Sequence, residues 1–466
     1  MLSLCTCVAL ANSENSHNDI GYSLPIWSCV PFLCMLLSIA VFPLVKPHWW
    51  EKNMLKVSLF WSLVFLVPFG IAYGMGMLTY QVLEIVLLDY LPFIVLLFGL
   101  FVAAGGIVIK GSIAGTPKAN LIMLLIGTGL ASWIGTTGAS MLMIRPLIRA
   151  NAWREKKAHV VIFFIFMVSN IGGCLTPVGD PPLFLGFLRG ISFFWTMELL
   201  PVMLLNIAIL SVLFFFMDTK YMKKEIEAGR RPLVAKNGDK EPLRIEGSVN
   251  FVYIALIVAA VIISGLIPET EPFAAIPGLT VYGVTMPFNS IVQIVIILIA
   301  ALLSWKTTKR STRQLNGFTF GPIAEVAKLF IGIFITMIPA LAILRCYCGQ
   351  LGITEAWQFF WATGLQSSFL DNAPTYLVFL TTAASLGFTE GVATSIGNVL
   401  PEILMAVSAG SVFMGANTYI GNAPNFMVKS IAEENKIRMP SFFGYMAWSG
   451  CILIPVFIID TFIFFL

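Results

Sequence analysis

The stretch SNIGGCLTPVGDPPLFL, from Ser169 to Leu185, decides the fold that we predict for this chain. The apolar run VVIFFIFMV precedes it, but the stretch itself holds glycines and prolines at a density that cannot continue a helix. A helix that breaks inside a membrane leaves backbone groups unpaired. Because hydrocarbon cannot satisfy these groups, the break must line a cavity or be buried in protein. Asp180 lies at this break, and an acid at membrane depth marks a candidate functional site.

Composition places the chain among membrane proteins. Hydrophobic residues make up 58% of it and charged residues only 11%, whereas a soluble protein has roughly 25% charged residues. Many apolar runs reach about 18 residues, the length that spans a bilayer as a helix. We therefore expect an all-α polytopic membrane protein with about ten transmembrane helices and two re-entrant hairpins, embedded in the lipid bilayer.

The apolar runs divide the chain into two halves with the same order of elements. Each half has three spans, an interrupted hairpin, a broken span and a final span. The first half is predicted to contain 26–45, 55–78, 88–109, the interrupted segment 118–149, the broken segment 159–188 and 193–217. The second half is predicted to contain 249–266, 288–305, 322–345, the interrupted segment 355–386, the broken segment 399–428 and 441–466.

The domain organisation follows from this division. Residues 26–217 form the first repeat and residues 249–466 the second. Residues 218–248, with eight Lys or Arg and six Asp or Glu, form the linker between them. Residues 1–25 are read as a leader and an outer N-terminal segment. The first eleven residues resemble a signal peptide cut after Ala11, although without a basic n-region they equally fit a disordered start.

Two motifs recur at similar distances along the chain. Ser132–Thr136 aligns with Ser368–Asn372 at an offset of 236 residues. Thr176–Pro182 aligns with Thr418–Pro424 at an offset of 242 residues. Similar offsets at two separate motifs indicate an internal duplication.

Basic loops set the predicted topology, because Lys and Arg are enriched on the cytoplasmic side of a membrane. The basic groups fall inside if the N-terminus is outside and residues 218–248 are cytoplasmic. The first hairpin then enters from inside and the second from outside, so the two halves are inverted in the cell's inner (plasma) membrane. Inverted repeats are typical of secondary transporters, which bind their substrates near the midplane between the repeats.

The acids at the breaks are the leading candidates for chemistry. Asp180 and Asp371 suit helix capping, since Asp is a favoured N-cap and Pro a favoured first helical residue. They also suit a sodium or proton site, because hard cations prefer oxygen ligands. Glu84, Asp89 and Asp460 are expected to be solvated near outer span ends. The candidate ion- or substrate-binding residues are Asp180, Asp371, Asn372, Thr176, Asn170, Thr136, Thr137, Asn417, Thr418, Asn422 and Asn425, with Asp180 and Asp371 as the sodium ligands.

The sequence argues against several other classes. It has no phosphate-binding GxxxxGK[ST] loop, nucleophile elbow or HExxH motif, so we expect neither an enzyme nor a nucleotide-driven pump. We expect no cofactor and no nucleic-acid partner. Sodium ions and protons are the expected transported ions, and transport energy is expected to come from an ion gradient or from a separate subunit.

Three strings resemble the ion-transporter superfamily: NIGGCLTPVGDPP at 170–182, FLDNAPTY at 369–376 and ANTYIGNAPNF at 416–426. That group includes D-type sodium/proton antiporters, arsenite/anion permeases, citrate transporters and divalent-anion/sodium symporters. The GGxxTPxGD motif at Gly172–Asp180 and the LDN motif at Leu370–Asn372 look most like the antiporter branch. The resemblance implies sodium binding where hairpins and broken helices cross, a homodimer, and elevator-type motion.

Other features are similar to the citrate branch. The pair Pro181-Pro182 recurs in the citrate and anion branches, and the first hairpin tip, Gly135–Gly138, lacks the acid that many antiporters carry. Two functions follow. The first is sodium/proton antiport with Asp180 and Asp371 as exchanging carboxylates. The alternative is a sodium- or proton-coupled citrate or dicarboxylate carrier, so the small partner is either an inorganic cation or an organic anion. The absence of an Arg at the hairpin tips favours the cation.

Overall fold

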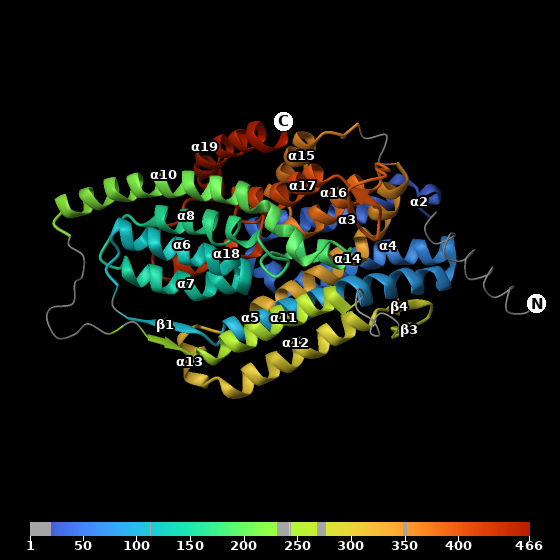
Figure 1. Ribbon diagram of the computed structural model, residues 1–466, viewed down its shortest axis with the longest axis horizontal. Coiled ribbons are helices and arrows are strands. Elements are labelled where there is room, and N and C mark those ends of the chain that lie inside the picture. Colours follow the sequence, from blue (N-terminus) through green and yellow to red (C-terminus); the bar gives the residue numbers. More distant parts are fainter. Residues whose placement is uncertain (1–19, 112, 231–241, 243, 268–275, 348–351) are drawn as a thin grey trace, which may run out of the picture.

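Helices form nearly all of the regular structure, as the sequence predicts. The computed structural model describes residues 20–111, 113–230, 242, 244–267, 276–347 and 352–466 (Figure 1). Within these residues, eight helices are long and apolar enough to cross a membrane. The prediction of an all-α polytopic membrane protein is confirmed. The signal peptide predicted at residues 1–11 lies outside the described part of the chain.

The first half begins with short elements and long helices and then contains the broken pieces. Its elements are α2 (Ile20–Ser23), η1 (Ile26–Cys29), α3 (Val30–Val45), α4 (Pro47–Glu84), the π-helix η2 (Ile85–Tyr90), α5 (Leu91–Ala104), α6 (Pro117–Ile134), α7 (Thr136–Ala150), α8 (Ala158–Met167), η3 (Ile171–Gly173), α9 (Pro181–Leu188), η4 (Phe193–Leu199) and α10 (Leu200–Glu227).

The second half also contains long helices, a hairpin and a broken segment. Its elements are α11 (Val249–Leu266), α12 (Phe288–Thr307), α13 (Arg310–Leu315), α14 (Gly321–Tyr347), α15 (Ala356–Phe369), α16 (Asn372–Ala384), α17 (Pro401–Met414), η8 (Gly415–Asn417), α18 (Ala423–Glu434), α19 (Phe442–Asp460) and the π-helix η9 (Thr461–Phe465). Three short antiparallel pairs complete the structure: β1 (Val108–Lys110) with β2 (Arg244–Glu246), β3 (Leu279–Val281) with β4 (Val284–Met286), and β5 (Val392–Ala393) with β6 (Asn398–Val399).

The predicted spans 55–78 and 88–109 imply a loop at residues 79–87, and this prediction is wrong. The backbone is helical there, and α4 continues through η2 into α5. The break comes earlier, at Gly74, whose φ of 86° and ψ of 156° are not helical. Glycine adopts a positive φ without the steric cost that other residues meet. The span boundary therefore depends on one backbone conformation that hydropathy does not report.

The start of the predicted linker is also wrong. Helix α10 continues to Glu227, well into the expected loop at 218–248. The residues in this extension are mostly good helix formers, such as Lys, Glu and Met. Strand β2, further along the linker, pairs with β1 of the first half. The charged linker thus starts as part of the last helix of the first half.

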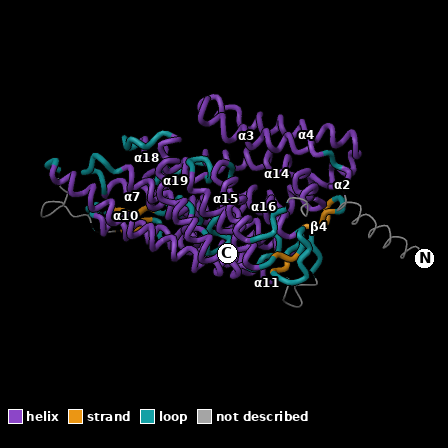
Figure 2. Tube along the Cα trace, turned by 90° about the horizontal axis from the view of Figure 1, so that it is seen from above, coloured by secondary structure: helices purple, strands orange, loops and turns teal. Residues whose placement is uncertain are grey.

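The two halves interlock through their hairpins. Helices α6 and α7 form the first hairpin, and α15 and α16 the second. The second arm of each hairpin packs against the broken segment of the other half, α16 against α9 and α7 against α18. Helices α5, α11 and α12 pack together along one edge of the molecule (Figure 1). Helices α3, α4 and α14 pack together at another edge (Figure 2).

A buried ionic cluster joins the first hairpin to α10. Arg154 donates hydrogen bonds to the Asp218 carboxylate and to the carbonyl oxygen of Gly115, the latter at 2.8 Å. His159 Nε2 lies 2.7 Å from Asp218 Oδ1, and its ring stacks on Tyr221. The sequence places His159 at a span end, and the structure shows it to be 2% exposed. This cluster fixes where the hairpin ends and α8 begins.

Removing Arg154 is expected to destabilise the protein strongly. Arg154→Ala leaves the Asp218 charge buried without its main partner, and breaking a buried ion pair costs about 3–5 kcal/mol. The matched control is Lys110→Ala, which breaks a half-exposed pair with Glu246 at 2.8 Å and is expected to cost about 1 kcal/mol or less. Unfolding of the purified protein measures both. Equal effects of the two substitutions would contradict a structural role for the cluster.

Candidate functional site

The glycines and prolines of each broken segment explain where its helices end and begin. Helix α8 ends at Met167, and α9 starts at Pro181, where the missing N–H costs nothing. Gly179 lies very close to the backbone at Gly173, so that a Cβ added at Gly179 would be 2.1 Å from the Gly173 carbonyl oxygen. The equivalent position in the second half, Gly421, is similarly crowded. Both breaks are closely packed protein interior, which is how a bilayer-embedded break is satisfied.

The two breaks are held by matching hydrogen bonds. Ser132 Oγ donates to the carbonyl oxygen of Gly172 at 2.6 Å, and Ser368 Oγ donates to that of Met414 at 3.1 Å. The Thr176 hydroxyl donates to the carbonyl oxygen of Ser132. Thr418 does the same to Ser368. These bonds reproduce the offsets of 236 and 242 residues found in the sequence, so the internal correspondence extends to individual atoms.

Asp180 lies where these elements meet, and its side chain has three donors. Thr136 Oγ1 donates to Oδ1 at 2.8 Å. Asn422 Nδ2 donates to the same oxygen at 3.2 Å. Asn372 Nδ2 donates to Oδ2 at 2.5 Å. Asp180 is 1% exposed, and all three partners are neutral.

The donors come from the starts of three helices, and Asp180 itself marks the start of a fourth. Thr136 is the first residue of α7, and Asn372 is the first residue of α16. Asp180 is the N-cap of α9, and Asn422 is the N-cap of α18. A helix N-terminus carries partial positive charge and unpaired N–H groups, so it favours negative charge nearby. The site is therefore suited to an anion, although no Arg or Lys among the described residues bonds to Asp180.

A second group of amides supports Asn422. Asn170 Nδ2 donates to Asn425 Oδ1 at 2.7 Å, and Asn422 Nδ2 lies 3.3 Å from Asn170 Oδ1. Asn425 Nδ2 donates to the carbonyl oxygens of Gly415 and Thr418 at 2.9 Å each. Side chains from both halves thus form one neutral network that fixes the orientation of the Asn422 amide.

Asp371 does not join this network. It is the N-cap of α16, and its Oδ1 accepts a hydrogen bond from the Ala373 backbone N–H at 3.1 Å. It is partly exposed, unlike Asp180. Of its two predicted roles, the geometry displays capping, and Asp180 and Asp371 do not share a hydrogen-bond partner among the described residues.

The remaining candidates form no hydrogen bond with Asp180 in the part of the chain that the structure describes. Thr137 is half-buried and follows Thr136 in α7. Thr176 and Thr418 bond to backbone carbonyl oxygens of the hairpins. Asn417 Nδ2 donates to Ser368 Oγ at 2.9 Å. Among all the candidate residues, two buried amide oxygens have no hydrogen-bond partner in the described part of the chain, Asn372 Oδ1 and Asn417 Oδ1.

The sequence did not single out the serines that hold the site together. Ser132 and Ser368 each bond to a broken segment, and Ser169 accepts through its carbonyl oxygen from Asn422 at 3.2 Å. The available signal was that Ser132 and Ser368 open the two aligned hairpin motifs. A serine among apolar residues is common in helices, so the alignment alone did not distinguish them.

Two acids expected to be solvated are buried. Asp89 is 3% exposed and pairs with Arg189 at 2.7 Å. Asp460 is fully buried and bonds to Asn206. The prediction of solvation is wrong for both, because each acid packs against a residue distant in sequence, Arg189 for Asp89 and Asn206 for Asp460. No group of three or more His, Cys, Asp or Glu side chains suited to a metal ion occurs in the described part of the chain.

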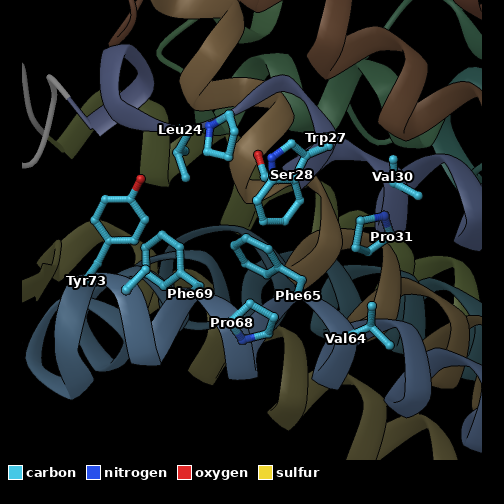
Figure 3. A pocket seen from close by; sticks show the side chains of 12 residues that line it. Leu24, Trp27, Ser28, Val30, Pro31, Val64, Phe65, Pro68, Phe69 and Tyr73 are labelled. Carbon is cyan, nitrogen blue, oxygen red and sulfur yellow. The ribbon is translucent and has the colours of Figure 1, made fainter.

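A separate cavity of about 510 Å³ lies between the segment Leu24–Pro31 and the middle of α4 (Figure 3). Phe65, Phe69 and Tyr73 face it from α4, and none of its lining residues is charged. It therefore offers no charged side chain to bind a carboxylate or a cation. The Asp180 network is therefore the better candidate site.

Comparison with known families agrees with a transporter. A family model described as "Putative citrate transport" matches residues 21–465, nearly the whole chain. A comparison with curated protein sequences gives no match.

Gly179→Ala is expected to disrupt the site. The new Cβ collides with the backbone at Gly173, which cannot move aside as a flexible side chain would, and overpacking of this kind costs about 1–3 kcal/mol. The control is Gly129→Ala in α6, where nothing lies within 4 Å of the added Cβ. We expect thermal unfolding of detergent-solubilised protein to show a lower midpoint for the first variant only. An unchanged midpoint for Gly179→Ala would contradict the close packing of the break.

Proposed function

The chain belongs to the citrate transport family, and from this premise we propose that it is a secondary transporter that carries a citrate-like carboxylate together with a cation. The transported anion, the coupling cation and the roles of individual residues are parts of this proposal. The observation that carries it is the convergence of four helix N-termini on Asp180.

Helix N-termini replace the missing arginines. The sequence shows no Arg at the hairpin tips, which at first favours a cation over an anion. In secondary transporters, however, half-helix N-termini near the midplane bind substrate carboxylates through their dipoles and open N–H groups. Starts of α7, α9, α16 and α18 supply that field from both halves. An anionic substrate next to the Asp180 network would be stabilised by all four.

Asp180 supplies the coupling. An ionised Asp180 repels a carboxylate substrate, by about 4 kcal/mol for unit charges 4 Å apart at an effective dielectric constant of 20. A proton or a sodium ion at Asp180 removes this repulsion. Substrate and cation then bind more tightly together than apart, which is the thermodynamic requirement for symport.

Sodium/proton antiport has less support. The family match favours the citrate carrier. The antiport hypothesis names Asp371 as a second exchanging carboxylate, but Asp371 caps α16 and shares no hydrogen-bond partner with Asp180 among the described residues. We therefore take the carrier as the function and keep antiport as an outcome of the test.

The membrane arrangement completes the proposal. We propose a multi-pass protein of the plasma or inner membrane, with its N-terminus outside, residues 218–248 in the cytoplasm and the halves inverted. The basic loops support this orientation. The proposed protein needs no cofactor, and a homodimer stays a prediction from the resemblance to the ion-transporter superfamily.

Transport in proteoliposomes tests the function. Labelled citrate uptake should require an inward gradient of protons or of sodium, and the gradient that drives uptake identifies the coupling cation. Unlabelled dicarboxylates should compete if the site accepts the wider class. A sodium-dependent change of internal pH without any organic acid, together with no citrate uptake, would establish antiport and overturn the proposal.

Asp180→Asn is expected to abolish coupled uptake. The amide cannot bind a proton or contribute a charge to a cation, while its size preserves the packing. We expect citrate uptake driven by the ion gradient to fall at least about tenfold, the effect of losing a charged hydrogen-bond group. Undiminished gradient-driven uptake by correctly inserted Asp180→Asn protein would exclude Asp180 as the coupling site.

Two neighbouring threonines, Thr136 and Thr137, provide a test variant and its matched control. Thr136→Val removes the donor to Asp180 Oδ1, whereas Thr137→Val changes a half-buried residue that does not contact Asp180. Loss of a hydrogen bond to a charged group costs about 1.5–3 kcal/mol, so we expect uptake by the first variant to fall about tenfold or more and uptake by the second to change little. Similar losses in both variants would show that the hairpin tip acts by packing alone.

A further inference from the structure

The last helices of the two halves share a buried acid that the proposed transport site does not use. Asp460 is the last residue of α19, and Asn206 lies in α10. Both side chains are fully buried. Asn206 Nδ2 lies 2.9 Å from Asp460 Oδ1 and 2.8 Å from Oδ2. No hydrogen bond among the described residues connects this pair to the Asp180 network.

The number of N–H hydrogens that Asn206 can donate to Asp460 decides which charge state of the acid this pair can stabilise. The Asn206 amide carries two hydrogens, and one is donated to the Val202 carbonyl oxygen at 2.8 Å. One hydrogen therefore serves both oxygens of Asp460. Asn206 Oδ1 is buried and has no hydrogen-bond partner among the described residues. An ionised carboxylate with one neutral donor is poorly compensated in a buried site.

The other buried acids are compensated differently. Asp89 pairs with Arg189, and Asp218 pairs with Arg154 and His159. Glu225 accepts from two backbone N–H groups and from Arg230. Asp180 has three donors. Among the buried acids that the structure describes, Asp460 is therefore the one with a single donor.

No charge on the surrounding elements neutralises Asp460. Helices α10, α15, α17, η8 and η9 pack around the end of α19 or its π-helical extension. Their titratable groups, with those of α19 and of the flanking η4 and α15 N-cap, are Glu198, Asp218, Lys220, Tyr221, Lys223, Lys224, Glu225, Glu227, Glu355, Glu402, Tyr445 and Cys451. None of them forms an ion pair or hydrogen bond with Asp460 in the described part of the chain.

We propose that Asp460 is a proton-binding site, separate from Asp180, whose carboxyl group takes up one proton and is neutral when α10 and α19 are packed as seen here. A proton needs a single acceptor oxygen, whereas a metal cation needs several oxygen ligands that this pair does not offer. The position of Asp460 in the chain is also typical of a functional site. The π-helix η9 starts at the next residue, and π-helical turns are frequent at functional sites.

The site is connected to the second hairpin. Trp361 Nε1 in α15 donates to Thr461 Oγ1, next to Asp460, at 3.0 Å. Release of the proton would leave a charge between α10 and α19 with one donor, so water would have to reach it and the helices would have to separate. Protonation at Asp460 therefore stabilises contact between the final helices of the two halves.

Infrared spectroscopy of the full-length protein in lipid nanodiscs tests this site without measuring transport. The carboxylic-acid C=O band at neutral pH reports protonated side chains. Asp180→Asn provides the background, because it removes the acid of the proposed transport site. Adding Asp460→Asn to this background should remove the absorption of one protonated carboxyl group. Adding Asp89→Asn should leave the band unchanged, because Asp89 pairs with Arg189.

A second variant keeps the test decisive if Asp460→Asn fails to fold. Asn206→Ala, in the same background, removes the donor to the carboxyl group, so the band should shift in frequency and remain present. An identical band with and without Asp460→Asn, or a band that Asn206→Ala does not move, would overturn the proposal. Neither result depends on which anion the protein transports, so failure here is separate from failure of the citrate proposal.

Discussion

The structure depends on one constraint, namely that the backbone of two helices broken at membrane depth has to find its hydrogen-bond partners inside the protein. Each half meets the constraint with the same pair of elements, a hairpin whose serine bonds to the break and a threonine of the break that bonds back to the hairpin. Once the hairpin and the break are fastened in this way, four helix N-termini are brought to one point. Packing of the breaks thus creates the electrostatic field of the site.

The two halves are alike in structure and different in charge. Asp180 and Asn422 occupy equivalent positions, and so do Thr136 and Asn372. All four meet, because Thr136, Asn372 and Asn422 each donate to Asp180. Two carboxylates at hydrogen-bond distance could not both be ionised without strong repulsion. One acid facing an amide gives a single site that can change its charge, shared by both halves.

Sequence reasoning identified the parts of this site that leave a local pattern. Glycine and proline mark the breaks, and offsets of 236 and 242 residues pair them, so Asp180, Asn372 and Asn422 were found together. Sequence reasoning could not distinguish Asp180 from Asp371, because both directly precede the start of a helix. Only three-dimensional packing buries Asp180 in the network and leaves Asp371 as a partly exposed cap. Hydropathy likewise gave the spans but not the break at Gly74, which depends on one positive φ. It also misplaced Asp89 and Asp460, whose burial comes from helices distant in sequence.

The distribution of charge partners separates fixed parts of the molecule from parts that can respond. Asp89 and Asp218, two of the buried acids away from the breaks, have arginine partners. An arginine keeps its charge at all relevant pH values, so it holds its acid ionised and makes the pair a permanent anchor. Asp180 has only hydroxyl and amide donors. Neutral donors tolerate both charge states of the acid, since binding a proton or a cation there leaves no unpaired counter-ion behind. The neutral surroundings of Asp180 therefore fit the role proposed for it, the loading and release of a cation in each transport cycle, whereas an arginine in the same place would hold the acid ionised.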